Sequence, residues 1–200
     1  INQESTGYGI TKNGAGRMKI SGAVTFTGPV TINGGSIVVD STSSLATVAG
    51  TIALASGTTL DVSAAGGLNL ATSQTLQGIG TVKGNVSDGS ASAIIVGPST
   101  GTLTINGSLS LNGSGSLAMK LANVTTVGGG VNDLIQVNGD LTLQDASPTP
   151  VAFSFKNGAP AAGTYTIMKY TGALSGSAAG LTTSAGGLAI TTSGNGCLAR

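Results

Sequence analysis

Few side chains in this sequence could catalyse a reaction or bind a metal ion. The 200 residues contain no histidine, one cysteine and seven acidic residues. Without histidine, the chain cannot by itself form a Ser-His-Asp triad, a Cys-His pair or a histidine-ligated zinc site. The single thiol, Cys197, has no base to activate it, so we expect a bystander, with crosslinking between molecules as the alternative. The remaining chemistry depends on the carboxylates, which are Glu4, Asp40, Asp61, Asp88, Asp133, Asp140 and Asp145.

Two groups of these carboxylates could act together. Asp40 and Asp61 could face one sugar, since glycoside hydrolysis needs two converging carboxyl groups. Asp133, Asp140 and Asp145 could surround a calcium ion. Aspartate also commonly caps turns through its side chain, and we favour this interpretation for all five. The sequence therefore predicts no catalytic, cofactor-binding or metal-binding residue, and we expect the chain not to be an enzyme.

The composition is that of a folded chain with an aliphatic core and an unusually uncharged surface. Charged residues make up 8% of the chain, against about 25% in an average soluble domain. Hydrophobic residues reach 40% and aromatic residues only 3%, so the core must consist mainly of small aliphatic side chains. The basic residues are scattered, which argues against a nucleic-acid partner. No run approaches the ~20 apolar residues that span a bilayer, so we expect no membrane span.

The strongest signal is a repeat of short segments in which apolar and polar residues alternate. Alternation with a period of two predicts short strands with one buried face. Successive segments follow one another too closely for strands of ordinary length that are joined by hairpins. The segments begin at Val24, Val30, Ile37, Ile52, Leu60, Leu68, Ile94, Leu103, Leu109 and Leu117.

Three ladders of apolar residues indicate a longer period. They are Val24, Leu45 and Leu68; Val30, Ile52 and Leu76; and Ile37, Leu60 and Val82. Repeats of this kind stack because each one can bury its apolar face only against its neighbours. We therefore predict an all-β fold, a right-handed parallel β-helix (β-solenoid) with about 22 residues per coil and three short strands in each coil. A sandwich of hairpins is the rival fold, because Asn-Gly pairs favour hairpins and begin at Asn33, Asn106, Asn112, Asn138 and Asn157.

The regularity of the repeat divides the chain into three parts. Residues 1–20 are more charged and less periodic, and we interpret them as an N-terminal arm or cap. Residues 21–127 form the regular coils. Residues 128–200 begin with three glycines and lose the register, so we interpret them as a modified C-terminal β region that closes the solenoid.

Four segments resemble a known family of bacterial surface proteins. They read GIGTVKGNV at residues 78–86, GTLTINGSLSL at 101–111, NDLIQVNGDLTL at 132–143 and GTYTIMKY at 163–170. In these segments the chain resembles the autotransporter-associated β-strand repeat proteins, over roughly residues 22–175. The resemblance implies a secreted β-helix displayed at the cell surface, as in adhesin passengers. Because Ile1 opens a polar stretch with no apolar leader, we interpret the chain as one whose signal peptide has been removed.

The sequence predicts an extracellular structural protein that assembles with itself. Residues 188–192 form an uncharged strand-like segment, and residues 1–19 could reach a neighbouring copy and add a strand to it. Head-to-tail contacts of this kind do not close, so they would produce a filament. The first alternative is an adhesin-type binding module that recognises surface glycans or other cell-surface components. The second alternative is a polysaccharide-acting enzyme, which would need an organised groove of carboxylates.

Overall fold

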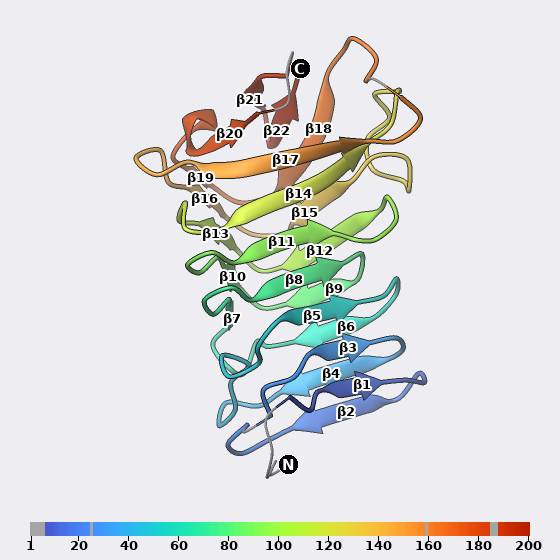
Figure 1. The fold of residues 1–200 in the computed structure, drawn as a ribbon. Helices are drawn as coiled ribbons and strands as arrows, with labels where there is room; N and C mark the ends of the chain where they lie inside the picture. The colour runs from blue at the N-terminus through green and yellow to red at the C-terminus, as the bar shows by residue number, and fades with distance from the viewer. Residues whose placement is uncertain (1–6, 25, 159, 185–187) are drawn as a thin grey trace.

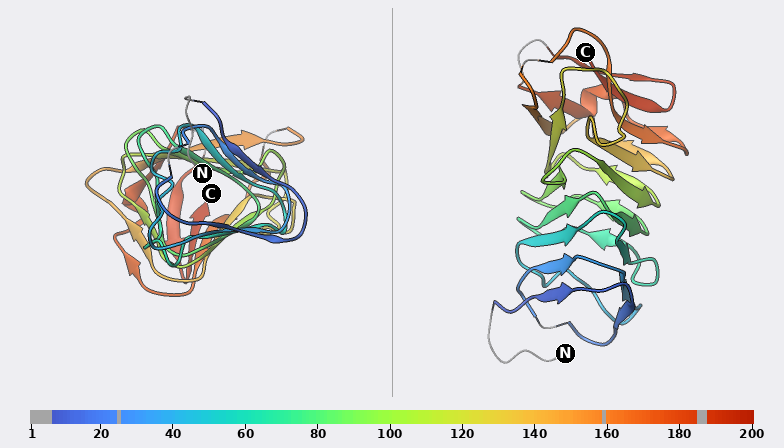
Figure 2. Two further views of the ribbon diagram at one scale, coloured as in Figure 1. Left: turned by 90° about the horizontal axis from the view of Figure 1, so that it is seen from below. Right: turned by 90° about the vertical axis from the view of Figure 1, so that its right-hand side faces the viewer.

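The chain forms a parallel β-helix in which short strands stack coil upon coil along one axis (Figure 1). The computed structural model describes residues 7–24, 26–158, 160–184 and 188–200. Seen along the axis, the coils enclose a three-sided interior, and seen from the side they form a rod with the first described coil at one end and the C-terminus at the other (Figure 2). The fold predicted from the repeat is therefore confirmed.

Each side of the rod is one sheet. The first side is an eight-stranded sheet that contains β1 (Ile10–Lys12), β3 (Val30–Ile32), β5 (Thr51–Leu54), β8 (Thr75–Gly78), β11 (Ala93–Val96), β14 (Ser116–Leu121), β17 (Thr149–Phe155) and β20 (Leu181–Thr183). The second is a nine-stranded sheet that contains β2 (Arg17–Ile20), β4 (Ser36–Val39), β6 (Thr59–Asp61), β9 (Thr81–Lys83), β12 (Thr102–Asn106), β15 (Leu134–Val137), β18 (Tyr165–Tyr170), β22 (Gly196–Ala199) and β21 (Ile190–Ser193). The third is a five-stranded sheet that contains β7 (Leu68–Asn69), β10 (Val86–Ser87), β13 (Leu109–Leu111), β16 (Leu141–Leu143) and β19 (Leu174–Ser175).

The strand register confirms the expected period over most of the rod. In the eight-stranded sheet, paired residues follow one another in the order Ile10, Val30, Ile52, Leu76, Ile94, Leu117 and Val151. Hydrogen bonds between neighbouring coils span similar separations, 20 positions from Asn33 to Asn13 and 22 from Lys83 to Asp61. The separation grows to 34 for the bond from Ser147 to Gly113, because the connections lengthen after β14.

The core is a stack of aliphatic layers, as the composition predicted. In the nine-stranded sheet, one inward column consists of Ile37, Leu60, Val82, Ile105 and Val137, all completely buried. Neighbouring coils lie about 4.8 Å apart, so each of these side chains packs against the one above and the one below. Alternate residues point outward and are mostly hydroxyl, amide or small side chains. This separation of inward and outward residues explains the alternation in the sequence.

Two of the three predicted ladders are present residue by residue. Val30 pairs with Ile52 and Ile52 with Leu76, while Leu60 pairs with both Ile37 and Val82. The third ladder is wrong. Val24, Phe26 and Leu45 are assigned to no strand, and the five-stranded sheet begins only at Leu68, which pairs with Val86.

The third side of the first two coils is irregular because a turn interrupts it. Phe26, Leu45 and Val48 are buried there, but Leu45 and Val48 are the two ends of a turn in which the Val48 N–H donates to the Leu45 carbonyl at 3.1 Å. The hydrogen bonds between coils in this region are isolated. One example is the Ala49 N–H, which donates to the Thr27 carbonyl at 2.6 Å. Thr25, in the predicted segment Val24 to Phe26, lies outside the described residues.

The boundaries of the solenoid differ from those expected. Residues 10–20 are part of the first coil, because β1 pairs with β3 and β2 pairs with β4; residues 1–6 of the expected arm lie outside the described residues. At the other boundary, parallel pairing continues past residue 128 to β20. The coils there carry a longer connection at residues 122–133, between β14 and β15. The pairing changes at β22, which runs antiparallel to β18 and β21.

The rival sandwich of hairpins is excluded for the coils, since all pairs from β1 to β20 are parallel. The Asn-Gly pairs instead lie at corners, where some asparagines stack between coils. Asn33 Nδ2 donates to Asn13 Oδ1 at 2.9 Å, and Asn138 Nδ2 donates to Asn106 Oδ1 at 2.7 Å. The one helical segment among the described residues is a 3₁₀ turn, η1 (Ala178–Gly180). No helix in the described ranges has the length and apolar character of a transmembrane segment.

Candidate functional site

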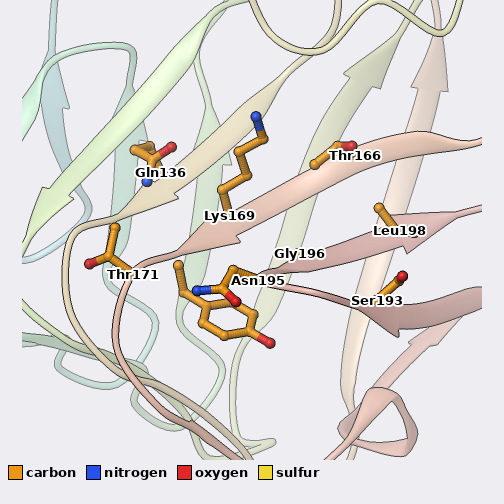
Figure 3. A pocket seen from close by; sticks show the side chains of 9 residues that line it. Gln136, Thr166, Lys169, Thr171, Ser193, Asn195, Gly196 and Leu198 are labelled. Atoms are coloured by element: carbon orange, nitrogen blue, oxygen red, sulfur yellow. The ribbon is translucent and has the colours of Figure 1, made fainter.

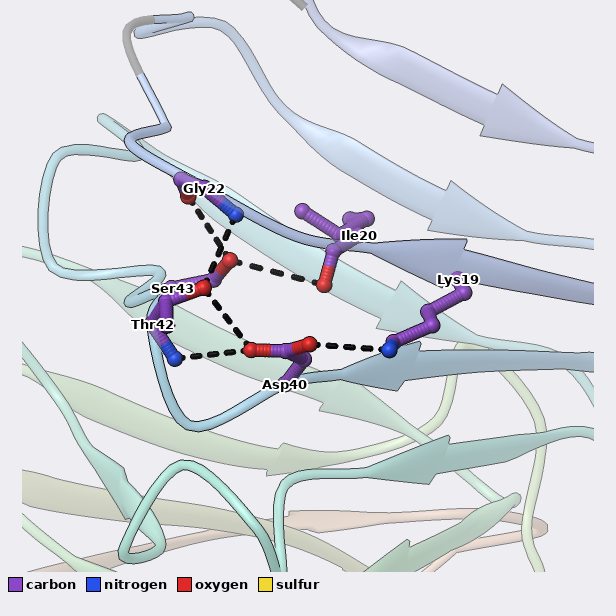
Figure 4. Close-up of polar contacts among 6 residues, drawn as sticks. All are labelled: Lys19, Ile20, Gly22, Asp40, Thr42 and Ser43. Carbon is purple, nitrogen blue, oxygen red and sulfur yellow. Dashed lines mark hydrogen bonds and ion pairs between the residues drawn. The ribbon is translucent and has the colours of Figure 1, made fainter.

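Asp40 and Asp61, the pair that could have faced one sugar, lie where the paired strands β4 and β6 end, and each caps its own turn; Figure 4 shows the contacts of Asp40. Asp40 Oδ1 accepts hydrogen bonds from the Thr42 N–H and hydroxyl, both at 2.8 Å. Asp61 Oδ1 accepts the equivalent bonds from the N–H and hydroxyl of Ser63, at 3.1 and 2.6 Å. The turn-capping interpretation of these two residues is therefore confirmed.

Each of these two aspartates also binds a lysine from a neighbouring coil. Lys19 Nζ lies 2.9 Å from Asp40 Oδ2, and Lys83 Nζ lies 3.1 Å from Asp61 Oδ2. The hydrogen bond from Lys19, followed by those from Thr42, holds the pKa of Asp40 well below its usual range. Burial tends to raise the pKa of Asp61, but the bonds from Ser63 and Lys83 together lower it. Both carboxylates are thus ionised and act as structural hydrogen-bond acceptors. A general acid must instead hold a proton that it can donate.

Three further aspartates connect one coil to the next. The buried carboxylate of Asp88 accepts hydrogen bonds from the N–H groups of Asn112 and Gly115, at 2.6 and 3.1 Å. Asp140 accepts one from the Ala173 N–H at 2.8 Å, and Asp145 accepts two from Ser177. Each donor lies one coil further along the chain. These carboxylates satisfy backbone N–H groups at corners, where the strand ladder leaves them without partners.

The most deeply buried polar pair is Asn132 and Asp133, at the end of the long connection between β14 and β15. Asn132 Oδ1 accepts from the Ala122 N–H at 2.6 Å, and its amide donates to the carbonyls of Val124 and Thr126 at 2.7 and 2.6 Å. Asp133 is 0% exposed and accepts from the N–H groups of Gly101 and Lys120, at 3.0 and 2.6 Å. The pair therefore fixes the path of the connection and ties it to the coil below.

Replacing Asp133 with Asn is expected to lower the free energy of unfolding by about 1–3 kcal/mol, because an amide N–H₂ must then face a backbone donor. Burial raises the pKa of Asp133 to about 6, against the opposing effect of its two hydrogen bonds. Between pH 3.8 and about 6, the folded protein therefore holds a proton that the unfolded chain has lost. The stability from this group is complete below that window and is lost as the pH rises through it. Thermal melts should show the wild type gaining stability from pH 7 to pH 4.5 and the variant gaining much less; parallel profiles would contradict the assignment.

The other chemistry expected from the sequence is not assembled at one place in the described ranges. Asp133, Asp140 and Asp145 bind different turns, and no three His, Cys, Asp or Glu side chains of the described residues lie together as metal ligands. Glu4 lies outside those residues. Cys197 is a buried free thiol on β22, and burial raises its pKa to about 12. A thiol that stays protonated at neutral pH is a poor nucleophile.

The outward faces of the sheets, which the sequence did not single out, carry long rows of hydrogen-bonding side chains. The row on the nine-stranded sheet, called here the outer row, consists of Arg17, Ser36, Thr59, Thr81, Thr104, Gln136 and Lys169. It contains no acidic member, and its two cations stand at its ends. A second row, on the five-stranded sheet, consists of Asn69, Ser87, Ser110, Thr142 and Ser175. The sequence signal for both rows was the polar half of each alternating segment.

The outer row leads into an open hollow above β15 and β18 (Figure 3). The hollow has a volume of about 480 Å³ and is lined by Gln136 and Lys169 of the row, together with Thr166, Ser193 and Asn195. Figure 3 shows these side chains on β15, β18, β21 and the turn between β21 and β22, around one patch of surface. The arrangement offers hydroxyl, amide and ammonium groups without a carboxylate, which suits hydrogen bonding to a polar ligand.

Comparison with known proteins links this chain to autotransporters. A family model described as the passenger-associated-transport repeat matches residues 10–39, from the first residue of β1 to the last residue of β4. The adhesin BmaC autotransporter of Brucella suis biovar 1 (strain 1330) is 43% identical over 77 residues, which cover 37% of this chain and 2% of that protein. No solved structure matches the chain. The resemblance to autotransporter passenger repeats is therefore confirmed, and residues 10–39 match one such repeat.

Proposed function

We propose that this chain is a non-catalytic, adhesin-type segment of an autotransporter passenger, exposed at or released from the bacterial surface. The observation that carries the proposal is the outer row, which presents hydroxyl and amide groups along consecutive pairings of a rigid sheet. A regular, weakly charged surface of this kind can hydrogen-bond to an extended ligand without ordering flexible loops. The similarity to a protein named as an adhesin also supports an adhesive role.

Assembly into a filament, the role favoured by the sequence, has less support than adhesion. It depended on a free arm at residues 1–19, but residues 10–12 and 17–20 are strands of the first coil. The similarity to an adhesin gives self-assembly no support. Surface glycans or other cell-surface components are the partners that we propose.

The adhesive role can be tested by coating beads with the purified chain and counting their attachment to mammalian epithelial monolayers. Wild-type beads should attach, and the double variant Thr81→Glu/Thr104→Glu should attach several-fold less, because it places two like charges inside the outer row. Both threonines are partly exposed and point outward, so the melting temperature should change little.

The matched control carries Ser110→Glu/Thr142→Glu, which adds the same charges to the row on the five-stranded sheet. This variant should attach as well as the wild type. Equal loss in both variants would mean that net charge, and not the outer row, governs attachment. If the wild type does not attach and sediments as long polymers, the filament function replaces the adhesive one.

A further inference from the structure

A second hollow lies at the corner where strands of the eight-stranded sheet end. Figure 1 shows the ends of two of these strands, β11 and β17, at its right. It has a volume of about 390 Å³, within the range of about 300–1,000 Å³ typical of small-ligand sites. Its walls come from the turn between β11 and β12, which includes Ser99, and from the ends of β14 and β17. The side chains that matter are Lys120, Ser154, Phe155 and Lys156.

Two lysines of this hollow have no acidic partner. Lys120 Nζ donates to the carbonyls of Gly97 and Val96, at 2.6 and 3.5 Å, so its ammonium group is held in place at the wall. Within the described ranges, neither Lys120 nor Lys156 forms an ion pair, in contrast to Lys19 and Lys83. The carboxylate of Asp133 accepts the backbone N–H of Lys120, but it is completely buried and already bound to two N–H groups. The surface of the hollow is therefore positive.

Phe155 adds an apolar platform beside these charges. It pairs with Leu121, a completely buried residue, and so occupies an inward register position. It is nevertheless 38% exposed, because β20 pairs only with Thr149–Val151 and leaves the second half of β17 without a strand on that side. Aromatic residues make up only 3% of this chain, so an exposed ring next to two lysines is an unusual combination for it.

We infer that this hollow binds a carboxylated sugar residue of a glycan. Lys156 and Lys120 pair with the carboxylate, the face of Phe155 packs against the C–H groups of the sugar ring, and the hydroxyls of Ser99 and Ser154 bond to sugar hydroxyls. A neutral sugar would leave the lysines unused, and a purely anionic ligand such as phosphate would leave the ring unused. The inference builds on the proposed adhesive function by naming a ligand class and a site for it.

A titration of the ¹⁵N-labelled chain with defined oligosaccharides, followed through amide chemical shifts by NMR, tests this site. The probes are 3′-sialyllactose against lactose, and a glucuronate-containing tetrasaccharide against its carboxyl-reduced form, which separate sialic acid from uronic acid as the source. At least one carboxylated probe should shift the amides around Lys120 and Lys156, and its neutral counterpart should not. Lys156→Ala should weaken binding by about tenfold or more, while Lys156→Arg should retain most of it.

Two further variants complete the test. Lys12→Ala removes a lysine that, like Lys120, donates to backbone carbonyls but lies on β1, outside this hollow and the outer row, and it should leave the affinity unchanged. Phe155→Ala should weaken binding of the sugar with little effect on an acidic peptide, because a peptide carboxylate needs only the lysines. Equal binding of neutral probes, equal loss in Lys156→Ala and Lys12→Ala, tighter binding of a glutamate peptide than of the sugars, or no binding at all would each overturn the inference.

The outcomes also separate this site from the adhesive function. If wild-type beads attach to cells and Lys156→Ala beads attach equally well, the sugar site plays no part and adhesion stands. If the chain binds the carboxylated sugar but its beads do not attach to cells, the site stands and the adhesive function fails.

Discussion

Replacing Leu60 with Asp is expected to unfold the coils around it, with a loss of about 5 kcal/mol or more. Leu60 is completely buried and packs between Ile37 and Val82 in the inward column. The substitution removes the aliphatic contacts with both neighbours and places a carboxylate where no donor is available. A loss of this size is comparable with the whole stability of many domains. Circular dichroism melts and hydrogen exchange of the amides in residues 30–106 would measure it.

The control is Thr59→Asp, one residue away on the same strand but pointing outward. It adds the same charge and should change the free energy of unfolding by about 0.5 kcal/mol or less. A Leu60→Asp variant that melts like the wild type would mean that the inward register of the nine-stranded sheet is wrong. Because coils in such a stack contact only their neighbours, the variant should unfold less cooperatively and at a lower melting temperature than the wild type.

Replacing Gly78 with Ala is expected to cost several kcal/mol despite adding only one methyl group. Gly78 ends β8, where it pairs with Leu54 on one side and Val96 on the other. A Cβ on Gly78 would lie 2.1 Å from the Leu54 carbonyl oxygen, and the residue has φ +144°, which side chains disfavour. The clash is with backbone that belongs to a sheet hydrogen-bonded on both sides, so it cannot be relieved by a rotamer change.

A chemical denaturation series would measure the effect, with Gly16→Ala as the matched control. A Cβ on Gly16 would meet nothing within 4 Å, and the backbone there is not in the left-handed region. This control should be neutral, or stabilising by a few tenths of a kcal/mol through the unfolded state. If both variants have the same stability, strands β5 and β8 do not approach each other as closely as described.

Alternation and spacing were enough to predict the β-helix wherever strands face strands. The ladders through Ile52 and Leu60 could be predicted because the residue about 22 positions away from each, in the neighbouring coil, is also aliphatic and also points inward. The third ladder failed because Leu45 is buried by a turn, and burial on a turn has no period. The boundary at residue 20 was wrong because charge at Lys12 and Arg17 is compatible with outward positions in a coil. After residue 128 the spacing pattern is lost although the stack continues, because a long loop changes the spacing in the sequence without interrupting the strand pairing.

The polar interior could have been anticipated only in part. Asp88 follows Val86 and Ser87, so strict alternation already placed it on the inward face of the coil. Its partners at Asn112 and Gly115 could not be foreseen, because they depend on how the next turn folds. For Asn132 and Asp133 the sequence offered only their position at the start of a segment that resembles the family repeats. The outer row could not be identified from the sequence, because the coils have unequal lengths. Only the strand register shows that Thr59, Thr81 and Thr104 are paired.

The direction of the hydrogen bonds has a mechanical consequence for a rod of this kind. The strands run around the axis, so the bonds between coils lie parallel to it and a pull along the axis loads them one coil at a time. Unwinding one coil would release about 70 Å of extended chain in exchange for about 4.8 Å of stack. Tension would therefore be relieved by peeling single coils, each held by few bonds, while the others remain folded. Turns tied across coils by Asp88 or Asp133 would be the points at which peeling pauses.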